Sequence, residues 1–484
     1  MVRRHTALTA LAIGSLAACS SDSITPLAPS ATTPSLATSA SGAPKFIVQF
    51  TADAVPDDFA SEVAALGGNV DMRLEGAGIA VVTASRADFE AAAERIGGVE
   101  SVTPDLQIQW VDPNQEVVDL AHTGPINTHD DPFYPIQWQL PAIDAPAAWA
   151  AGATGAGARV AVLDGGFYVA HPDLNDNFDL AASRSFVPGF NYNQDTGTFW
   201  HGTHVAGIVA AEDNDRGVLG VAPKATLIGV KVLHNGSGAF SWVLNGLYYA
   251  STPLAAGGAG ADIINMSLGG IIPEKSSDKD DRTYVKDLIK SFDRAAGYAN
   301  RNGTTVIASA GNSNINFDEE GRHTITLPGG ANHVIGVSAT APVGWALGAT
   351  NFSQRTSYTN TGKQLVDLSA PGGDSEYPGN ELCTVGPIRN VCWVFDLVLS
   401  TSRGSTVNGG YSWAGGTSMA APMVAGVAAL IVGQNGGDMK PAQLEAALRQ
   451  SAIDLGKPGK DEIYGHGWVN AARAVGAVGT VAGK

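Results

Sequence analysis

The sequence predicts an α/β protein: a doubly wound, mostly parallel sheet, preceded by a small α+β domain. In the C-terminal two thirds of the chain, near-continuous apolar runs of strand length alternate with longer helical stretches, and a β-α-β-β-α-β pattern comes before them. Parallel strands buried on both faces are apolar at almost every position. The composition agrees, because 44% hydrophobic residues can fill a large core and 59 glycines among 484 residues favour many tight loops.

The small domain is expected at residues 45–110. "KFIVQF" is of strand type, and "PDDFASEVAALGG" places Phe59, Val63 and Leu66 at helical spacing before a glycine pair. "NVDMRL" and "IAVVT" predict a hairpin, "RADFEAAAERIGG" a second helix and "VESVTPDLQIQW" a last strand. This order is the split ferredoxin-like arrangement, which by itself fixes no function.

The large domain is expected at residues 131–478. "RVAVLD", "TLIGVKV", "DIINMSL" and "TTVIASA" are its predicted strands, with helices between them at 239–256 and 285–302. The alternation predicts a doubly wound sheet. In such sheets the functional side chains gather at the carboxyl ends of the strands.

The N-terminal residues have the pattern of a targeting signal. Arg3 and Arg4 precede an apolar stretch that is too short to span a bilayer. The stretch ends in "LAAC", which resembles the lipobox of bacterial lipoproteins, with Cys19 as the lipidated residue; the alternative is an ordinary secretory signal with an incidental cysteine. Residues 1–19 are thus a signal peptide, 20–44 a flexible tether rich in Ser, Thr, Pro and Ala, and 111–130 a processing linker.

The net charge and the number of cysteines argue against two classes of function, nucleic-acid binding and cysteine-ligated zinc binding. A net charge of −17 argues against nucleic acid as a partner, because phosphate binding needs an excess of lysine and arginine. Cys383 and Cys392 remain beside Cys19. In an oxidising compartment they could form a disulfide, and two free thiols are the alternative. Two cysteines are too few for a cysteine-ligated zinc site.

Three residues form a candidate catalytic set. Asp164 ends "RVAVLD", His201 opens "HGTHVAGIVAA", and Ser418 precedes a long apolar run in "GGTSMAAP". Each also has a simpler interpretation: a turn residue, a metal-binding pair with His204, and a helix cap. However, "HGTH" lacks the glutamate and the spacing of the HExxH zinc motif. Carboxylate, imidazole and serine together are the parts of a Ser-His-Asp system, here in the order Asp, His, Ser.

The blocks "VAVLDGG", "HGTHVAG", "NMSLGG", "ASAGNS" and "GTSMAAP" occur in this order. The chain therefore resembles the subtilisin-type serine endopeptidases, the subtilase or S8 peptidase family, and residues 45–109 resemble the family's inhibitory propeptide. The resemblance implies that Ser418 is the nucleophile, that His201 is the general base and then the general acid, and that Asp164 orients the imidazole. It further implies an oxyanion-hole side chain and a substrate-binding strip with an opposite rim: Asn312, then Ser267, Leu268 and Gly269, with Gly238 opposite.

A structural calcium site also follows from the resemblance, with no catalytic metal. Its ligands would be carboxylates, one amide side chain and backbone carbonyls, all oxygen donors that suit calcium. They are Asp131, Asp173, the carbonyl of Glu212, the side chain of Asn214, and the carbonyls of Arg216 and Val218. The alternative is an acidic surface loop.

Departures from the family pattern affect specific points. Gly165 stands where the family usually has Ser or Thr, so that Asp164 would lose a hydrogen-bond donor, and Met423 replaces a common histidine. Residues 314–327 and 374–410 are longer than in compact relatives. The first of these insertions lies near the expected S1 wall, so the preference at P1 is not carried over; a broad or apolar preference is favoured because no acidic cluster calls for a basic residue.

The sequence thus predicts an exported endopeptidase, made as a zymogen that cuts itself between about residues 110 and 131. A lipid on Cys19 would hold the precursor at the cell envelope, and the cut would release a monomeric catalytic domain. Its partners would be protein substrates and its own propeptide. Three alternatives remain: a catalytically silent binding protein, a lipoprotein protease inhibitor, and an esterase, although "GTSMA" is not the G-x-S-x-G elbow.

Overall fold

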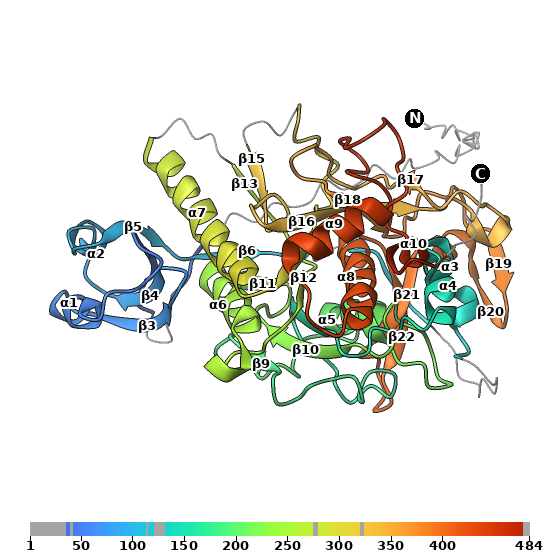
Figure 1. Cartoon of the computed structure of the whole chain (residues 1–484), viewed down its shortest axis with the longest axis horizontal. Helices are drawn as coiled ribbons and strands as arrows, with labels where there is room; N and C mark the ends of the chain where they lie inside the picture. Colours follow the sequence, from blue (N-terminus) through green and yellow to red (C-terminus); the bar gives the residue numbers. More distant parts are fainter. Residues whose placement is uncertain are drawn as a thin grey trace, which may run out of the picture. The chain divides into compact units, whose positions relative to one another are not determined.

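The computed structural model describes residues 35–38, 42–112, 115–120, 131–273, 279–319 and 324–477. The predicted doubly wound sheet is confirmed: eight strands pair in the order β17-β16-β14-β12-β8-β10-β9, with β18 beside β16 (Figure 1). All pairs are parallel except β16 with β17. The strands are β8 Arg159–Asp164, β9 Arg184–Ser185, β10 Thr226–Lys231, β12 Ile263–Met266, β14 Thr305–Ser309, β16 Val334–Ala341, β17 Gln354–Arg355 and β18 Leu368–Pro371.

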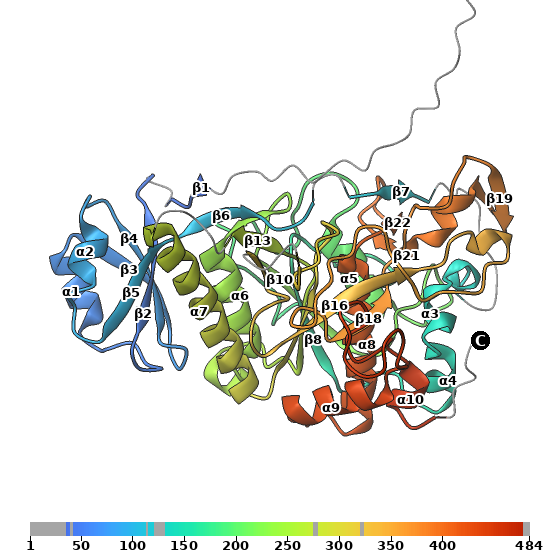
Figure 2. The same ribbon diagram turned by 90° about the horizontal axis from the view of Figure 1, so that it is seen from above.

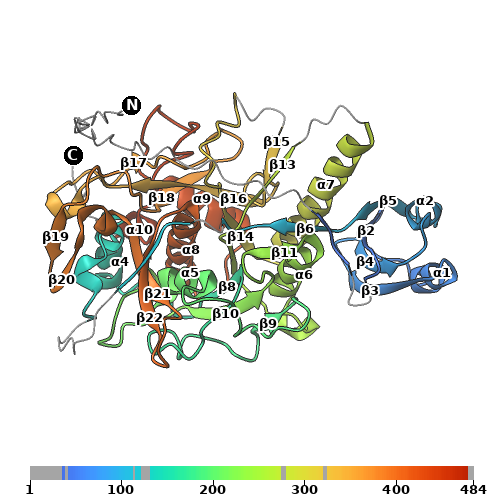
Figure 3. The same ribbon diagram turned by 180° about the vertical axis from the view of Figure 1, so that it is seen from behind.

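Helices cover both faces of this sheet. Along β8, Val160 and Val162 belong to the core formed with α5 (His201–Ala210) and α8 (Thr417–Gln434). The alternating residues Ala161 and Leu163 belong to a second core, formed with α6 (Phe240–Ser251) and α7 (Lys279–Arg301). Figure 2 shows α6 and α7 side by side, and Figure 3 shows α5 beside α8. The period of two is what a strand buried on both faces requires.

Two predicted helix boundaries change. The helix expected at 239–256 ends at Ser251, because Thr252 precedes Pro253 and is extended, with ψ 132°. A short 3₁₀ turn, Leu254–Ala256, follows it. The helix expected at 285–302 begins earlier, at Lys279. Within the described residues, α8 is long and apolar enough to pass a length-and-hydropathy test for a membrane span, and 89% of that stretch is buried in the protein.

The small domain has the predicted split order. Its antiparallel sheet runs β3-β4-β2-β5, and its core contains Phe59 and Val63 from α1 and Phe89 and Ala93 from α2. The bounds are β2 Lys45–Phe50, α1 Phe59–Ala65, β3 Gly68–Leu74, β4 Ile79–Ala84, α2 Phe89–Ala93 and β5 Val99–Pro104.

The predicted last strand of this domain is in fact two strands. After Pro104 the chain leaves the small sheet, and β6 (Leu106–Gln109) pairs with β1 (Ser35–Leu36) on one edge and with β11 (Ser237–Ala239) on the other. Residues 20–44 were expected to be a flexible tether, but Ser35–Leu36 within them form a strand that pairs with β6. Cys19 and most of that tether lie outside the described residues.

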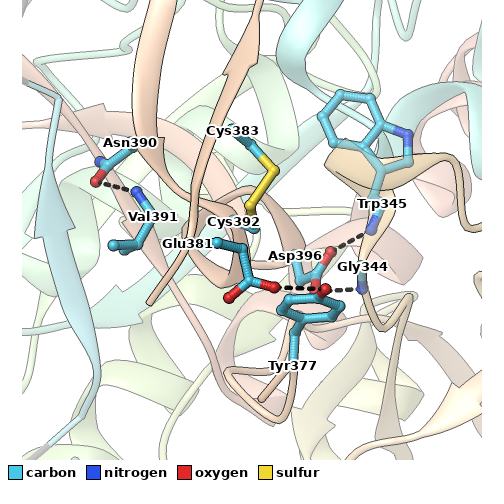
Figure 4. The surroundings of a disulfide bond; sticks show 9 residues. All are labelled: Gly344, Trp345, Tyr377, Glu381, Cys383, Asn390, Val391, Cys392 and Asp396. Carbon is cyan, nitrogen blue, oxygen red and sulfur yellow. Dashed lines mark hydrogen bonds between the residues drawn. A yellow bond between two sulfur atoms is a disulfide. The ribbon is translucent and has the colours of Figure 1, made fainter. Parts of the chain in front are cut away.

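The 374–410 insertion contains a disulfide between Cys383 and Cys392. It closes the hairpin of β19 (Leu382–Val385) and β20 (Ile388–Val391), shown in Figure 4. Asp396 beneath it accepts hydrogen bonds from the backbone N–H groups of Gly344 and Trp345, both at 2.7 Å.

The remaining elements are β7 Val117–Asp119, β13 Gly270–Pro273, β15 Thr324–Leu327, β21 Val398–Ser402, β22 Gly410–Ala414, α3 Gln139–Ala142, α4 Ala145–Ala150, α9 Pro441–Ser451, α10 Ala471–Ala474 and the 3₁₀ turns Tyr134–Ile136, Trp345–Leu347 and Cys392–Asp396.

Candidate active site

Asp164 and His201 are in direct contact at the carboxyl end of β8. Nδ1 of His201 lies 2.8 Å from Oδ2 and 3.0 Å from Oδ1 of Asp164, and both side chains are buried. Gly202 permits this approach, because a Cβ there would lie 3.0 Å from the Cβ of Asp164 and 2.8 Å from the carbonyl oxygen of Gly166. An imidazole with Nδ1–H on a carboxylate keeps Nε2 free to accept a proton.

Ser418 is the second residue of α8, where helix N–H groups have no partner within the helix. Its hydroxyl donates to the carbonyl oxygen of Ser267 at 3.3 Å. Nε2 of His201 is buried without a hydrogen-bond partner among the described residues. Catalytic hydrogen bonds in ligand-free sites are often long or not formed.

Ser267 also donates a hydrogen bond to the first turn of α8, where a proline has removed a backbone donor. Pro422 has no N–H and leaves the carbonyl oxygen of Ser418 without its usual i+4 donor. The hydroxyl of Ser267 donates to that oxygen instead, at 2.7 Å. The two serines therefore hold each other's position, and Pro422 is accommodated within α8.

The alternative of a metal-binding histidine pair does not fit the geometry. Nε2 of His204 bonds to the carbonyl oxygen of Ser412 at 2.9 Å, whereas His201 contacts Asp164. Burial lowers the pKa of His204 to about 3. His204 is therefore a neutral core residue whose hydrogen bond joins α5 to β22.

Asn312 lies at the N-terminus of α8, beside the expected nucleophile. Its Oδ1 accepts a hydrogen bond from the backbone N–H of Thr417 at 2.9 Å and another from the Thr417 hydroxyl at 2.7 Å. Because the carbonyl oxygen of the amide is held on both groups of Thr417, the NH₂ group is left as a donor beside the nucleophile.

The expected substrate-binding residues lie on both sides of residues 106–110, so that the chain itself occupies the space between them. β6 pairs antiparallel with β11, with Ile108 opposite Gly238. On the other side, the N–H of Gly269 donates to the carbonyl oxygen of Trp110 at 2.8 Å. Ser267 and Leu268 of the same strip are buried. A Cβ on Gly270, directly after the strip, would lie 3.2 Å from Cγ2 of Ile108 and 3.6 Å from the ring of Trp110, so this glycine leaves room for the segment.

The six expected calcium-binding residues come together in one loop region. The Arg216 N–H donates to Asp131 at 3.0 Å, and the Val218 N–H donates to Asp173 at 2.9 Å. The Asn214 amide donates to the Glu212 carboxylate at 3.2 Å. Oδ1 of Asp173 and Oδ1 of Asn214 are buried and accept no hydrogen bond from the described residues.

Three carboxylates, of Asp131, Asp173 and Glu212, lie close together in this region. Burial raises the pKa of Asp173 well above its ordinary value, and the nearby carboxylates of Asp131 and Glu212 raise it further. Burial also raises the pKa of Asp131 to about 6. The described residues contain no cluster of three His, Cys, Asp or Glu side chains spaced for a metal. Calcium, however, also takes amide and carbonyl oxygens, so the donor set suits that ion.

Two residues beside Asp164 were not predicted from the sequence. Asp195 lies over Gly165, and Lys231 is fully buried at the end of β10. Lys231 donates to the carbonyl oxygens of Gly165 and of Leu233, the latter at 2.6 Å. Burial lowers the pKa of Lys231 to about 8. The available signal was a lysine inside the apolar run "TLIGVKV".

Comparison with known proteins identifies the family. The model of the subtilase family (Peptidase_S8) matches residues 155–467. The chain belongs to the subtilase family. Subtilisin E of Bacillus subtilis is 35% identical over 342 residues, which are 70% of this chain and 71% of that protein. M-protease of Shouchella clausii is 33% identical over 377 residues, 78% of this chain and 76% of that protein.

A solved structure supports the same fold. The epidermin leader peptide processing serine protease of Staphylococcus aureus superimposes with a TM-score of 0.69 over 90% of this chain and 98% of that one, at 20% identity. With the subtilisin relatives, the family assignment makes this subtilase a subtilisin-like serine endopeptidase, a hydrolase that acts on protein substrates.

Proposed function

We propose that Asp164, His201 and Ser418 are the catalytic triad of this subtilase. The observation that carries the assignment is the contact of His201 Nδ1 with both oxygens of Asp164, while Nε2 stays buried and unpartnered. Nε2 takes the Ser418 proton as the hydroxyl attacks the peptide carbonyl, and later gives it to the leaving amine. Asp164 fixes the tautomer and stabilises the imidazolium.

Asn312 stabilises the negative oxygen of the tetrahedral intermediate. Its carbonyl oxygen is held by Thr417, so its NH₂ group, which lies beside Gly416, is left to donate to the negative oxygen of the intermediate. The N-terminus of α8 adds free N–H groups and the positive end of the helix dipole. Ser267, Leu268 and Gly269 on one side, and Gly238 on the other, bind extended substrate by backbone pairing.

Residues 45–110 act as a propeptide that fills this cleft in the zymogen. The pairing of β6 with β11 and the bond from Gly269 to Trp110 are the contacts that a substrate strand would make. Self-cleavage falls in the linker 111–130, between the propeptide and the catalytic domain of residues 131–478, and the part of the linker after the cut stays on the mature enzyme. The mature enzyme is a monomer.

A calcium ion is held by Asp131, Asp173 and Asn214 together with the carbonyls of Glu212, Arg216 and Val218. The buried, unpartnered oxygens of Asp173 and Asn214 and the accumulated negative charge fit such an ion. The ion supplies no chemistry to the reaction. It stabilises the folded loop by mass action.

The precursor is exported, with a lipid on Cys19 as its anchor until processing releases the catalytic domain. The "LAAC" sequence after a short apolar stretch supports this. Labelling the cells with a radioactive fatty acid tests it: the wild-type precursor should carry label and the Cys19→Ser precursor should not.

The catalytic assignment is tested with residues 20–484 expressed as wild type and as Ser418→Ala in the presence of calcium. Intact mass and casein hydrolysis are recorded for both. If only the wild type loses roughly its first hundred residues and digests casein, Ser418 is the nucleophile and processing is autocatalytic. If both chains fold but remain full length and inert, the triad is inactive and a binding function replaces the proposal.

A further inference from the structure

The chain does not leave the active site after it has filled the cleft. Beyond Trp110, the side chain of Gln115 donates to the carbonyl oxygen of Gly415 at 3.0 Å and lies 3.1 Å from Sδ of Met419. Gly415 and Met419 flank Ser418 in the loop and first turn of α8. The chain therefore passes from the strip at Gly269 to the opposite side of the nucleophile.

After Glu116 the chain forms a short strand. β7 (Val117–Asp119) pairs antiparallel with β22 (Gly410–Ala414), with Val118 opposite Trp413. The Gly415 N–H points to the carbonyl oxygen of Glu116 at 3.4 Å, and the Leu120 N–H donates to the carbonyl oxygen of Tyr411 at 2.9 Å. Figure 2 shows β6 and β7 following one another, with β7 next to β22.

Among the residues that the structure describes, β7 alone pairs with the outer edge of β22. In the sheet β21-β22-β7, the inner edge of β22 is paired with β21 and the outer edge with β7. An uncovered strand edge is a row of free N–H and C=O groups that binds extended peptide. β22 leads directly into the loop that carries Ser418, so peptide on this edge lies on the leaving-group side of the cleaved bond.

The register of the β7–β22 pair determines which backbone groups of β7 form hydrogen bonds to β22. In an antiparallel pair the backbone bonds occur at every second residue. Because Glu116 and Leu120 bond to Gly415 and Tyr411, Val118 must present its N–H and C=O to Trp413. The N–H groups of Val117 and Asp119 point away from β22.

Side chains add selectivity to this backbone pairing. Val118 and Leu120 pack on an apolar cluster that includes Phe395 and Trp413. The hydroxyl of Ser412 donates to a carboxylate oxygen of Asp119 at 2.8 Å. The edge thus favours apolar residues with an acceptor such as Asp between them.

We propose that the outer edge of β22 is a substrate-binding strand for the polypeptide C-terminal to the cleaved bond, and that β7 occupies it in cis in the precursor. The inference rests on the proposed role of Ser418. It adds to the cleft a site several residues long on the leaving-group side, which binds extended chains and selects them by apolar residues and an acceptor facing Ser412.

The test uses mature enzyme from the wild type and from Val118→Pro, in which the cis strand loses its central N–H. All peptides share one unprimed sequence that the enzyme cleaves, followed by the chain's own residues 115–120 or by residues 115–116 alone. Two further long peptides are N-methylated, one at the residue equivalent to Val118 and one at that equivalent to Asp119. The second is the matched control, because its N–H points away from β22.

We expect kcat/KM to be roughly 10- to 50-fold higher for the long peptide than for the short one, as a few backbone hydrogen bonds would give. Methylation at the Val118 position should abolish this gain, whereas methylation at Asp119 should leave most of it. If β7 still covers the edge in the wild type, the difference appears only in Val118→Pro, which also supports the proposal.

Equal rates for the two methylated peptides in both enzymes would overturn it. If the proposed function itself is wrong, the result is distinguishable, because neither enzyme then cleaves even the short peptide. Should Val118→Pro fail to mature, protection of the Trp413 amide from hydrogen exchange by the long peptide is measured in mature wild type. Protection that methylation at the Val118 position removes supports the site, and unchanged exchange rejects it.

Discussion

The carboxylate of Asp195 occupies the space that a side chain on Gly165 would need, directly beside Asp164. With Asp195 in this place, residue 165 has room for glycine but not for a larger residue. Asp164 still accepts a hydrogen bond from this residue, because the backbone N–H of Gly165 donates to it at 2.6 Å.

We therefore expect Gly165→Ser, which restores the residue usual in the family, to lower activity rather than raise it. The added side chain must displace Asp195 or Asp164, and such overpacking costs about 1–3 kcal/mol. Kinetics and thermal unfolding of Gly165→Ser and of Gly165→Ser/Asp195→Ala are compared. The double variant should recover part of the loss; a single variant as active as the wild type would show that the site relaxes freely.

Asn312→Ala should lower kcat by roughly 100- to 1,000-fold with little change in KM, a magnitude measured in subtilisin itself for this kind of donor. Thr417→Val removes only the hydroxyl that orients Asn312, so its effect on kcat should be smaller. Steady-state kinetics on one peptide substrate separate the two. An equal loss in both variants would indicate that Thr417 acts on the serine directly.

Propeptide binding should weaken as the pH rises from about 4 to 6. Asp105, in the propeptide segment, accepts hydrogen bonds from the backbone N–H and the hydroxyl of Ser241 at the start of α6. Burial raises the pKa of Asp105 from 3.8 to about 6. The docked form then binds the proton more tightly than the free propeptide, so docking is strongest below pH 4 and is lost through this window.

The measurement is the dissociation of the cleaved propeptide from the mature enzyme between pH 4 and 7. Affinity should fall by roughly 10- to 100-fold across the window, and Asp105→Asn should flatten the profile. An Asp105→Asn profile as steep as that of the wild type would assign the pH dependence to another group.

Calcium removal should shorten the half-life of the mature enzyme at elevated temperature, through loss of ligand-dependent stabilisation. Asp173→Asn and Asn214→Ala should inactivate at the same rate with calcium and with a chelator. Asp213→Asn, a change at a neighbouring carboxylate outside the proposed ligand set, is the control and should keep the calcium response. If all three variants respond like the wild type, the loop holds no stabilising ion.

Loss of the Cys383–Cys392 bridge should destabilise the β19–β20 hairpin. Closing a loop of about ten residues contributes about 2–3 kcal/mol in the chain-entropy description. Because the hairpin is one part of a large protein, Cys383→Ser/Cys392→Ser should speed limited proteolysis within residues 374–396 and leave peptide hydrolysis nearly unchanged. Uniformly faster proteolysis would mean that the hairpin supports the whole domain.

The sequence by itself determined what depends on local pattern. Apolar runs and helical spacing predicted β8, β10, β12 and β14 of the large sheet and the split order of the small domain. Ordered motifs also singled out Asp164, His201 and Ser418, because each stands at the end of a strand or the start of a helix, where topology brings such residues together. These features depend on residues close to one another in the chain.

Only the tertiary structure decided the contacts between distant segments. It split the last strand of the small domain, paired β6 with β11 and β7 with β22, and placed Asp195 over Gly165. Strands β6, β7 and β11 are short. β11 lies more than a hundred residues from β6, and β22 lies more than a hundred residues from β7, so nothing in their own sequence identifies these partners. The physical reason is that the free edges of β11 and β22 and the space above Gly165 exist only once the sheet and its helices have assembled.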